Sequence, residues 1–101
     1  MISLKLAPPE DVSAELGARA RARRLALKLT QAGLAERSGV PLATLRKFER
    51  TGRIALTSFV RIALTLGDEE ALDGLLRARA GFTSLDAVMD APAPRKRGTR
   101  S

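Results

Sequence analysis

At residues 29–52 the chain carries the sequence LTQAGLAERSGVPLATLRKFERTG, its most informative segment. Thr30 is a favourable helix cap, and residues 31–37 after it have the apolar spacing of a short helix. Gly39 then marks a turn, because glycine readily adopts a positive φ. A second helix is expected over residues 42–50. The segment therefore predicts a helix-turn-helix, two short helices joined by a glycine-containing turn.

The apolar side chains of this segment indicate how the two helices pack. The wedge expected between them consists of Leu34, Val40, Leu45 and Phe48. Ala35 supplies the small side chain that a close helix crossing requires. Arg46 and Lys47 fall on the other side of the second helix, which is expected to face outward.

The flanking sequence predicts three more helices, so the expected fold class is all-α. The first is rich in alanine, leucine and arginine, and is expected to run from a cap at Asp11 or Ser13 to about Leu27. Its core-facing side chains are expected to be Leu16, Ala20 and Leu27. The residues before it alternate apolar and polar as far as Pro8 and Pro9, and predict a loose arm.

The other two helices are expected over residues 57–66 and 68–80, with stops at Gly67 and Gly81. The apolar stripe of the earlier one consists of Phe59, Ile62, Ala63 and Leu66. The stripe of the later one belongs either to the core or to a dimer seam, and consists of Leu72, Leu75 and Leu76. One more helical turn is expected at residues 84–89, followed by a disordered basic tail.

The composition restricts the classes of function. The chain has no cysteine and no histidine, so disulfides, structural zinc and histidine acid–base catalysis are not expected. We expect no metal, no cofactor and no enzyme activity. Aromatic residues make up 3% of the chain, which disfavours base-stacking platforms. Uncharged runs fall well short of the ~20 residues of a membrane span, so no membrane association is expected.

Positive charge is concentrated in one part of the chain. The net charge is +7, from 18 lysines and arginines against 11 acids. Residues 12–53 hold ten basic and three acidic side chains, whereas residues 54–94 hold three basic and six acidic ones. This asymmetry indicates a phosphate-facing surface and an opposite surface with another role. Three arginines of the first helix either line that surface or are merely solvated: Arg19, Arg21 and Arg23.

These features resemble the Cro/C1-type (XRE) family of helix-turn-helix regulators over residues 16–76. The resemblance rests on Arg24 and on three segments, which read LTQAGLAERSGV (29–40), TLRKFERTGRI (44–54) and VRIALTLG (60–67). It implies a five-helix, lambda-repressor-like domain that dimerises on DNA and inserts its third helix into the major groove. The chain then divides into an N-terminal arm (1–12), a helix-turn-helix domain (13–80) and a C-terminal extension with a basic tail (81–101).

The resemblance implies DNA-binding roles for two groups of residues. The base-reading group occupies the exposed positions of the third helix and consists of Leu42, Ala43, Thr44, Arg46 and Lys47. Arg46 or Lys47 can contact a guanine. Leu42 or Ala43 can pack on a thymine methyl, and Thr44 can reach a base or a phosphate. The group expected at phosphates or the minor groove consists of Gln31, Arg50 and Arg53.

The family pattern also implies a partly buried salt bridge between Arg24 and Glu49, with two separate surface charges as the alternative. The chain departs from that pattern at three positions near the motif. Gly33 replaces the usual acid of a capping box, Lys28 replaces a common glycine, and Pro41 replaces a serine-like cap.

The implied function is sequence-specific binding to double-stranded DNA by a homodimer on an inverted-repeat operator, with repression of transcription in the cytoplasm, at the nucleoid. A finer resemblance links FERTG (48–52), FTSLDAVM (82–89) and the basic tail to HipB-like antitoxins. It implies an alternative, an antitoxin that binds a HipA-like kinase toxin and autoregulates its operon. The tail can add DNA affinity, bind an acidic partner or keep the chain soluble.

Overall fold

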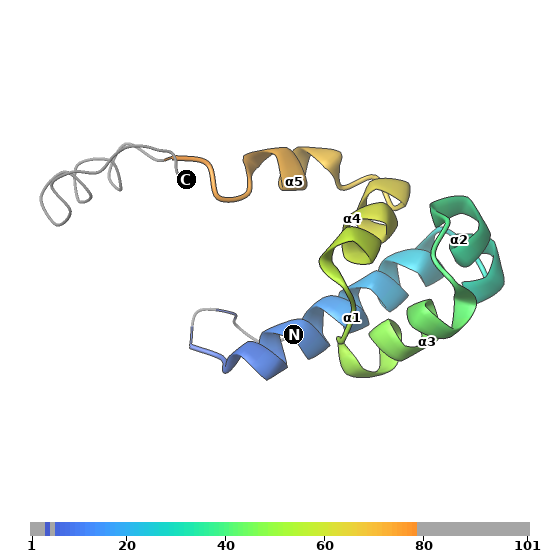
Figure 1. Cartoon of the computed structure of the whole chain (residues 1–101), viewed down its shortest axis with the longest axis horizontal. Coiled ribbons are helices and arrows are strands. Elements are labelled where there is room, and N and C mark those ends of the chain that lie inside the picture. The colour runs from blue at the N-terminus through green and yellow to red at the C-terminus, as the bar shows by residue number, and fades with distance from the viewer. Residues whose placement is uncertain (1–3, 5, 79–101) are drawn as a thin grey trace, which may run out of the picture.

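The computed structural model describes residues 4 and 6–78, and this part of the chain contains five α-helices and no strand (Figure 1). The helices are α1 (Pro9–Ala26), α2 (Gln31–Ser38), α3 (Leu42–Thr51), α4 (Leu56–Thr65) and α5 (Glu69–Gly74). The prediction of an all-α, five-helix fold is confirmed. The helical turn expected at residues 84–89 and the basic tail lie outside the described residues.

Helix α1 begins earlier than the sequence predicted. Its cap is Pro8, with Pro9 in the first turn, so the expected cap at Asp11 or Ser13 is wrong. Proline suits this position because its fixed φ is helical and the N–H that it lacks would have no partner in the helix. The backbone N–H of Asp11 donates to the Pro8 carbonyl at 2.9 Å. Part of the expected arm is therefore helical.

The end of α1 also corrects an expectation. Leu27 was expected in the core, but it is 49% exposed. The chain turns immediately after it, because Lys28 adopts the left-handed conformation with φ 61°. A lysine therefore takes the backbone shape for which glycine is usually preferred.

Helices α2 and α3 match their predicted ranges to within one residue. The Thr30 hydroxyl caps α2 by accepting a hydrogen bond from the Gly33 N–H at 2.9 Å. Gly39 forms the turn with φ 76°, and Gly52 ends α3 with φ 82°. Local capping and turn chemistry therefore explain where the helices of the motif begin and end.

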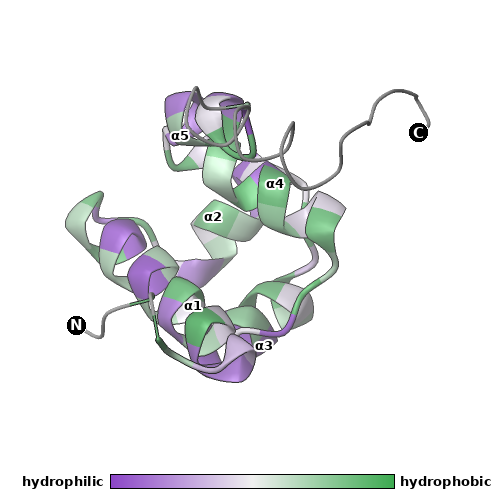
Figure 2. Ribbon diagram, turned by 90° about the vertical axis from the view of Figure 1, so that its left-hand side faces the viewer, coloured by the Kyte–Doolittle hydropathy of each residue, from purple (hydrophilic) through white to green (hydrophobic). Residues whose placement is uncertain are grey.

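The core lies between α1, α2, α3 and α4, and the expected wedge is at its centre. Its most completely buried side chains are Leu34, Leu45, Phe48 and Ile62. The rings of Phe48 and Phe59 meet edge to face, with centroids 5.8 Å apart. Figure 2 shows the four helices around this interior, with α4 hydrophobic over much of its length. Each such burial contributes ~1.5–3 kcal/mol, so this cluster holds the helices together.

Helix α5 is much shorter than the expected range of residues 68–80. The Asp68 side chain does not cap it, and the helix ends at Gly74, a residue of low helix propensity. Leu75 and Leu76 are 63% and 95% exposed, so neither belongs to the core of this chain. Leu72 is partly buried.

Candidate nucleic-acid interface

Helix α3 has one face in the core and the other in solvent. Leu45, Phe48 and Glu49 are buried, because they lie on the side that meets the other helices. The exposed positions are Ala43, Arg46, Lys47 and Arg50. Two expected base-reading residues, Leu42 and Thr44, are only partly exposed. Leu42 packs against the core cluster, so only part of its side chain is available to a ligand.

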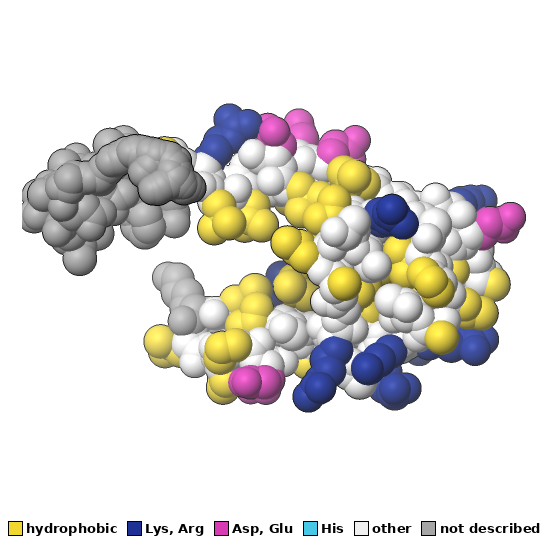
Figure 3. Space-filling view, viewed as in Figure 1, with side chains coloured by type: hydrophobic (Ala, Val, Ile, Leu, Met, Phe, Trp, Pro, Cys, Tyr) yellow, Lys and Arg dark blue, Asp and Glu magenta, His cyan; other side chains and the backbone are white. Residues whose placement is uncertain are grey.

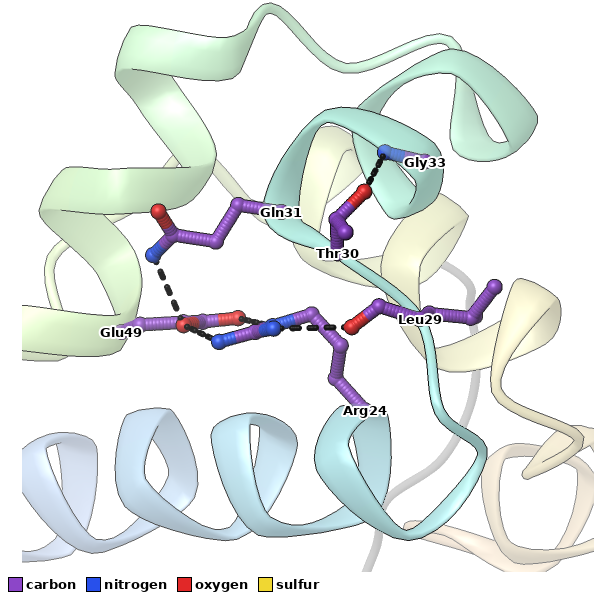
Figure 4. Close-up of polar contacts among 6 residues, drawn as sticks. All are labelled: Arg24, Leu29, Thr30, Gln31, Gly33 and Glu49. Carbon is purple, nitrogen blue, oxygen red and sulfur yellow. Dashed lines mark hydrogen bonds and ion pairs between the residues drawn. The ribbon is translucent and has the colours of Figure 1, made fainter.

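A buried polar network fixes this orientation of α3 (Figure 4). The Arg24 guanidinium of α1 donates to both carboxylate oxygens of Glu49, at 2.8 and 3.0 Å. It also donates to the Leu29 carbonyl at 2.9 Å, which anchors the link between α1 and α2. The Gln31 amide, at the start of α2, donates to the same Glu49 at 3.0 Å. Glu49 therefore connects three parts of the helix-turn-helix at once.

The network is more buried than the sequence led us to expect. The side chains of Arg24 and Glu49 are only 7% and 2% exposed. Such a pair requires several hydrogen bonds to offset the loss of water, and the contacts to Leu29 and Gln31 supply them. The amide nitrogen of Gln31 is engaged inside the protein and braces α3.

Residues 21–70 match the family model described as Helix-turn-helix. The segment is therefore similar to Cro/C1-type helix-turn-helix domains. The family is a DNA-binding one. Helix α3 is the second helix of the motif, the position that the recognition helix takes in helix-turn-helix domains, and we call it the recognition helix. No curated protein matches the chain.

The last turn of α3 and the turn that follows it hold one more exposed cation each, Arg50 inside the helix and Arg53 after it. The Thr51 hydroxyl donates to the Lys47 carbonyl at 2.7 Å and accepts the Arg53 N–H at 3.1 Å. These bonds fix where Arg53 leaves the helix, on the side that also carries Lys47.

The three arginines of α1 differ in their surroundings. Arg19 pairs with Glu15 one helical turn away, at 3.0 Å. Arg23 donates to the Leu66 carbonyl at 3.1 Å and to the Asp68 carboxylate at 2.8 Å. It therefore ties α1 to the junction between α4 and α5. Arg21 is exposed.

Two glycines have a role that the sequence did not reveal. A Cβ atom at Gly17 of α1 would lie 2.3 Å from the Phe48 carbonyl oxygen. A Cβ atom at Gly52 would lie 2.3 Å from the backbone of Ser13. Both glycines allow α1 and the recognition helix to approach backbone to backbone. Chain spacing alone gives no signal for this contact, because the two glycines are 35 positions apart.

Charge is segregated on the surface of the helix-turn-helix domain. Figure 3 shows basic side chains gathered along the edge formed by α3 and acidic side chains gathered over α5 at the opposite edge. The acidic side chains of α5 are Glu69, Glu70 and Asp73. This arrangement orients the α3 edge toward a polyanion and turns α5 away from it.

None of the helices in residues 4 and 6–78 has the length and apolar character of a membrane span.

Proposed function

We propose that this protein is a sequence-specific regulator that binds double-stranded DNA as a homodimer and represses transcription from an inverted-repeat operator. The observation that carries the proposal is the orientation of the recognition helix. Its inner face is fixed by Phe48 and by the buried Glu49, so Arg46 and Lys47 are held outward on a rigid support. A helix held in this way can enter a major groove without reorganisation.

Base recognition is assigned to the outer positions of α3. Arg46 donates to guanine O6 and N7, and the small, exposed Ala43 packs on a thymine methyl. Thr44 and the exposed part of Leu42 flank these contacts. Backbone contacts come from Gln31, whose amide nitrogen also braces α3, and from Arg50 and Arg53.

The proposed dimer places two recognition helices about one DNA turn apart, roughly 34 Å, on the two halves of the operator. The exposure of Leu75 and Leu76 supports this part of the proposal. Both directly follow α5, and α5 lies away from the basic edge (Figures 1 and 3). A second copy would remove this apolar surface from water.

The direct test begins with selection of preferred duplexes from a random pool. Binding of the selected duplex and of an unrelated duplex is then compared for the native protein and Arg46→Ala. Arg46→Ala should lose about 1–3 kcal/mol of binding free energy for the selected duplex and little for the unrelated one. Arg61→Ala, an exposed arginine on α4, is the matched control. An equal loss on both duplexes would assign Arg46 to phosphates, and failure to select any sequence would reject specific recognition.

A second candidate function is that of a HipB-like antitoxin that binds a HipA-like kinase and represses its own operon with it. The acidic surface of α5 supports this candidate, because it leaves a charged area free while α3 binds DNA. Co-expression with the product of the adjacent gene tests it. A stable complex that still binds the operator would support the antitoxin role, and separate elution of the two proteins would argue against it.

A further inference from the structure

An open cleft of about 560 Å³ lies between the first turns of α1 and the last turn of the recognition helix. Its lining residues are Glu10, Ser13, Lys47, Thr51 and Arg53. The close approach of Ser13 to Gly52 holds the two walls together, since no side chain separates the backbones there. The walls are therefore a fixed feature of the domain.

The cleft brings together two cations that belong to the DNA-binding edge. Lys47 and Arg53 are both exposed, and neither forms an ion pair within 4.0 Å in the described part of the chain. The Thr51 hydroxyl between them is already bonded to the backbone of both residues, so it fixes their spacing and leaves their charged groups free. Two neighbouring cations on a rigid wall suit a phosphate group.

Glu10 is the third charged group of this cleft. It is exposed, and it comes from the first turn of α1. Its carboxylate lines the same cleft as the two cations, so a phosphate that enters the cleft meets this negative charge as well. Figure 3 shows acidic side chains at the start of α1 on the same edge of the molecule as the basic side chains of α3.

We propose that this cleft binds a backbone phosphate of the DNA through Lys47 and Arg53, and that Glu10 competes with that phosphate and lowers the affinity. The proposal rests on the proposed function and deepens it. Lys47 lines the cleft with Thr51 and Arg53, whereas Arg46 does not, so a contact of Arg46 with a base leaves Lys47 free to bind the backbone. Lys47 is thereby assigned to the backbone rather than to a base edge.

The test measures binding of the selected duplex and of an unrelated duplex over a range of salt concentrations. Lys47→Ala and Arg53→Ala should each lower the affinity for both duplexes by the same factor, roughly 5- to 10-fold. Each should also reduce the slope of log affinity against log salt concentration by about 1. Glu10→Gln should raise the affinity for both duplexes by roughly 2- to 5-fold at low salt. This gain should disappear when Lys47 and Arg53 are also replaced by alanine. Glu36→Gln, an exposed site on α2 with the same change of charge, should give a smaller gain.

Two results with DNA would overturn the proposal. One is a loss for Lys47→Ala that is confined to the selected duplex, with an unchanged salt slope, because Lys47 would then read a base. The other is a gain for Glu10→Gln no larger than that for Glu36→Gln.

If the native protein binds no duplex, the proposed function fails, and the cleft is tested with inorganic phosphate. Amide shifts at Ser13 and Thr51 that are lost in Arg53→Ala would keep the phosphate site and assign it to a free phosphorylated ligand. No shift would overturn the site.

Discussion

Arg24 of α1 and Glu49 of α3 meet through two parallel N–H···O contacts of 2.8 and 3.0 Å, although 25 residues separate them in the chain. Both side chains are almost fully buried. Neither charge is well solvated in the folded protein, so each depends on the other and on the hydrogen bonds around them. The orientation of the recognition helix therefore depends on a pair of residues that need never touch DNA.

Replacement of either member of this pair should destabilise the domain strongly. Glu49→Gln leaves the buried Arg24 guanidinium without its carboxylate, and the free energy of unfolding should fall by about 3–5 kcal/mol. Urea denaturation followed by circular dichroism measures this loss. Glu15→Gln is the matched control, because it removes the more exposed pair with Arg19 and should cost ~0.5 kcal/mol or less. Similar losses for the two variants would show that burial of the Arg24 pair is energetically unimportant.

Gly17→Ala should destabilise the protein, although alanine is the better helix former by about 1 kcal/mol. The added methyl group would lie 2.3 Å from the Phe48 carbonyl oxygen, so α1 must move away from the recognition helix. We expect a net loss of about 1–3 kcal/mol in thermal or urea unfolding. Gly74→Ala is the control, since a Cβ there has no neighbour within 4 Å and should be neutral or stabilising. A stabilised Gly17→Ala protein would contradict the backbone-to-backbone packing.

The double variant with Leu75→Ser and Leu76→Ser should weaken self-association without unfolding the monomer. Both side chains are largely exposed in the single chain, so their replacement removes little intrachain burial. Sedimentation velocity should show a shift from dimer toward monomer, and circular dichroism should show unchanged helix content. Leu6→Ser is the control, because Leu6 is as exposed as Leu76, at 96% against 95%, but lies before α1. If the double variant associates as strongly as the native protein, the dimer interface does not include these two leucines.

Arg23→Ala should loosen the junction between α4 and α5. Its guanidinium donates to the Leu66 carbonyl and to Asp68, and loss of these partly exposed bonds should cost about 0.5–1.5 kcal/mol. Amide hydrogen exchange over residues 66–74 should accelerate, whereas exchange in α2 and α3 should stay slow. Arg21→Ala is the control, with an exposed arginine on the same helix. If Arg21→Ala accelerates exchange equally, the cause would be the loss of a positive charge from α1 rather than the loss of the Arg23 contacts.

The helix-turn-helix itself could be predicted because its signals are local. The Thr30 cap, the positive φ of Gly39 and the helical spacing of Leu34, Leu45 and Phe48 can all be read from neighbouring positions in the chain. The match of residues 21–70 to the helix-turn-helix family supports the same interpretation. The specific contacts of the base-reading and phosphate residues stay predictions that the experiments above test.

The ends of the domain were harder to predict, since their signals are ambiguous. The Pro8-Pro9 pair indicates a stop for a strand, but it also forms a good helix start, and packing of α1 on α3 selects the helix. The apolar stripe of Leu72, Leu75 and Leu76 predicts a long α5, yet the chain leaves the helix at Gly74. A stripe of leucines shows that burial is favourable but does not say which surface provides it.

The amino-acid sequence alone determined the two helices of the motif, the turn between them and the outward face of Arg46 and Lys47, because capping, turn geometry and helical periodicity act over a few residues. Tertiary structure decided which distant groups meet. It placed Glu10 and Ser13 beside Lys47 and Arg53, and it brought Gly17 against the Phe48 carbonyl. Such meetings depend on how whole helices cross, and the crossing is set by the summed packing of the core rather than by any local pattern.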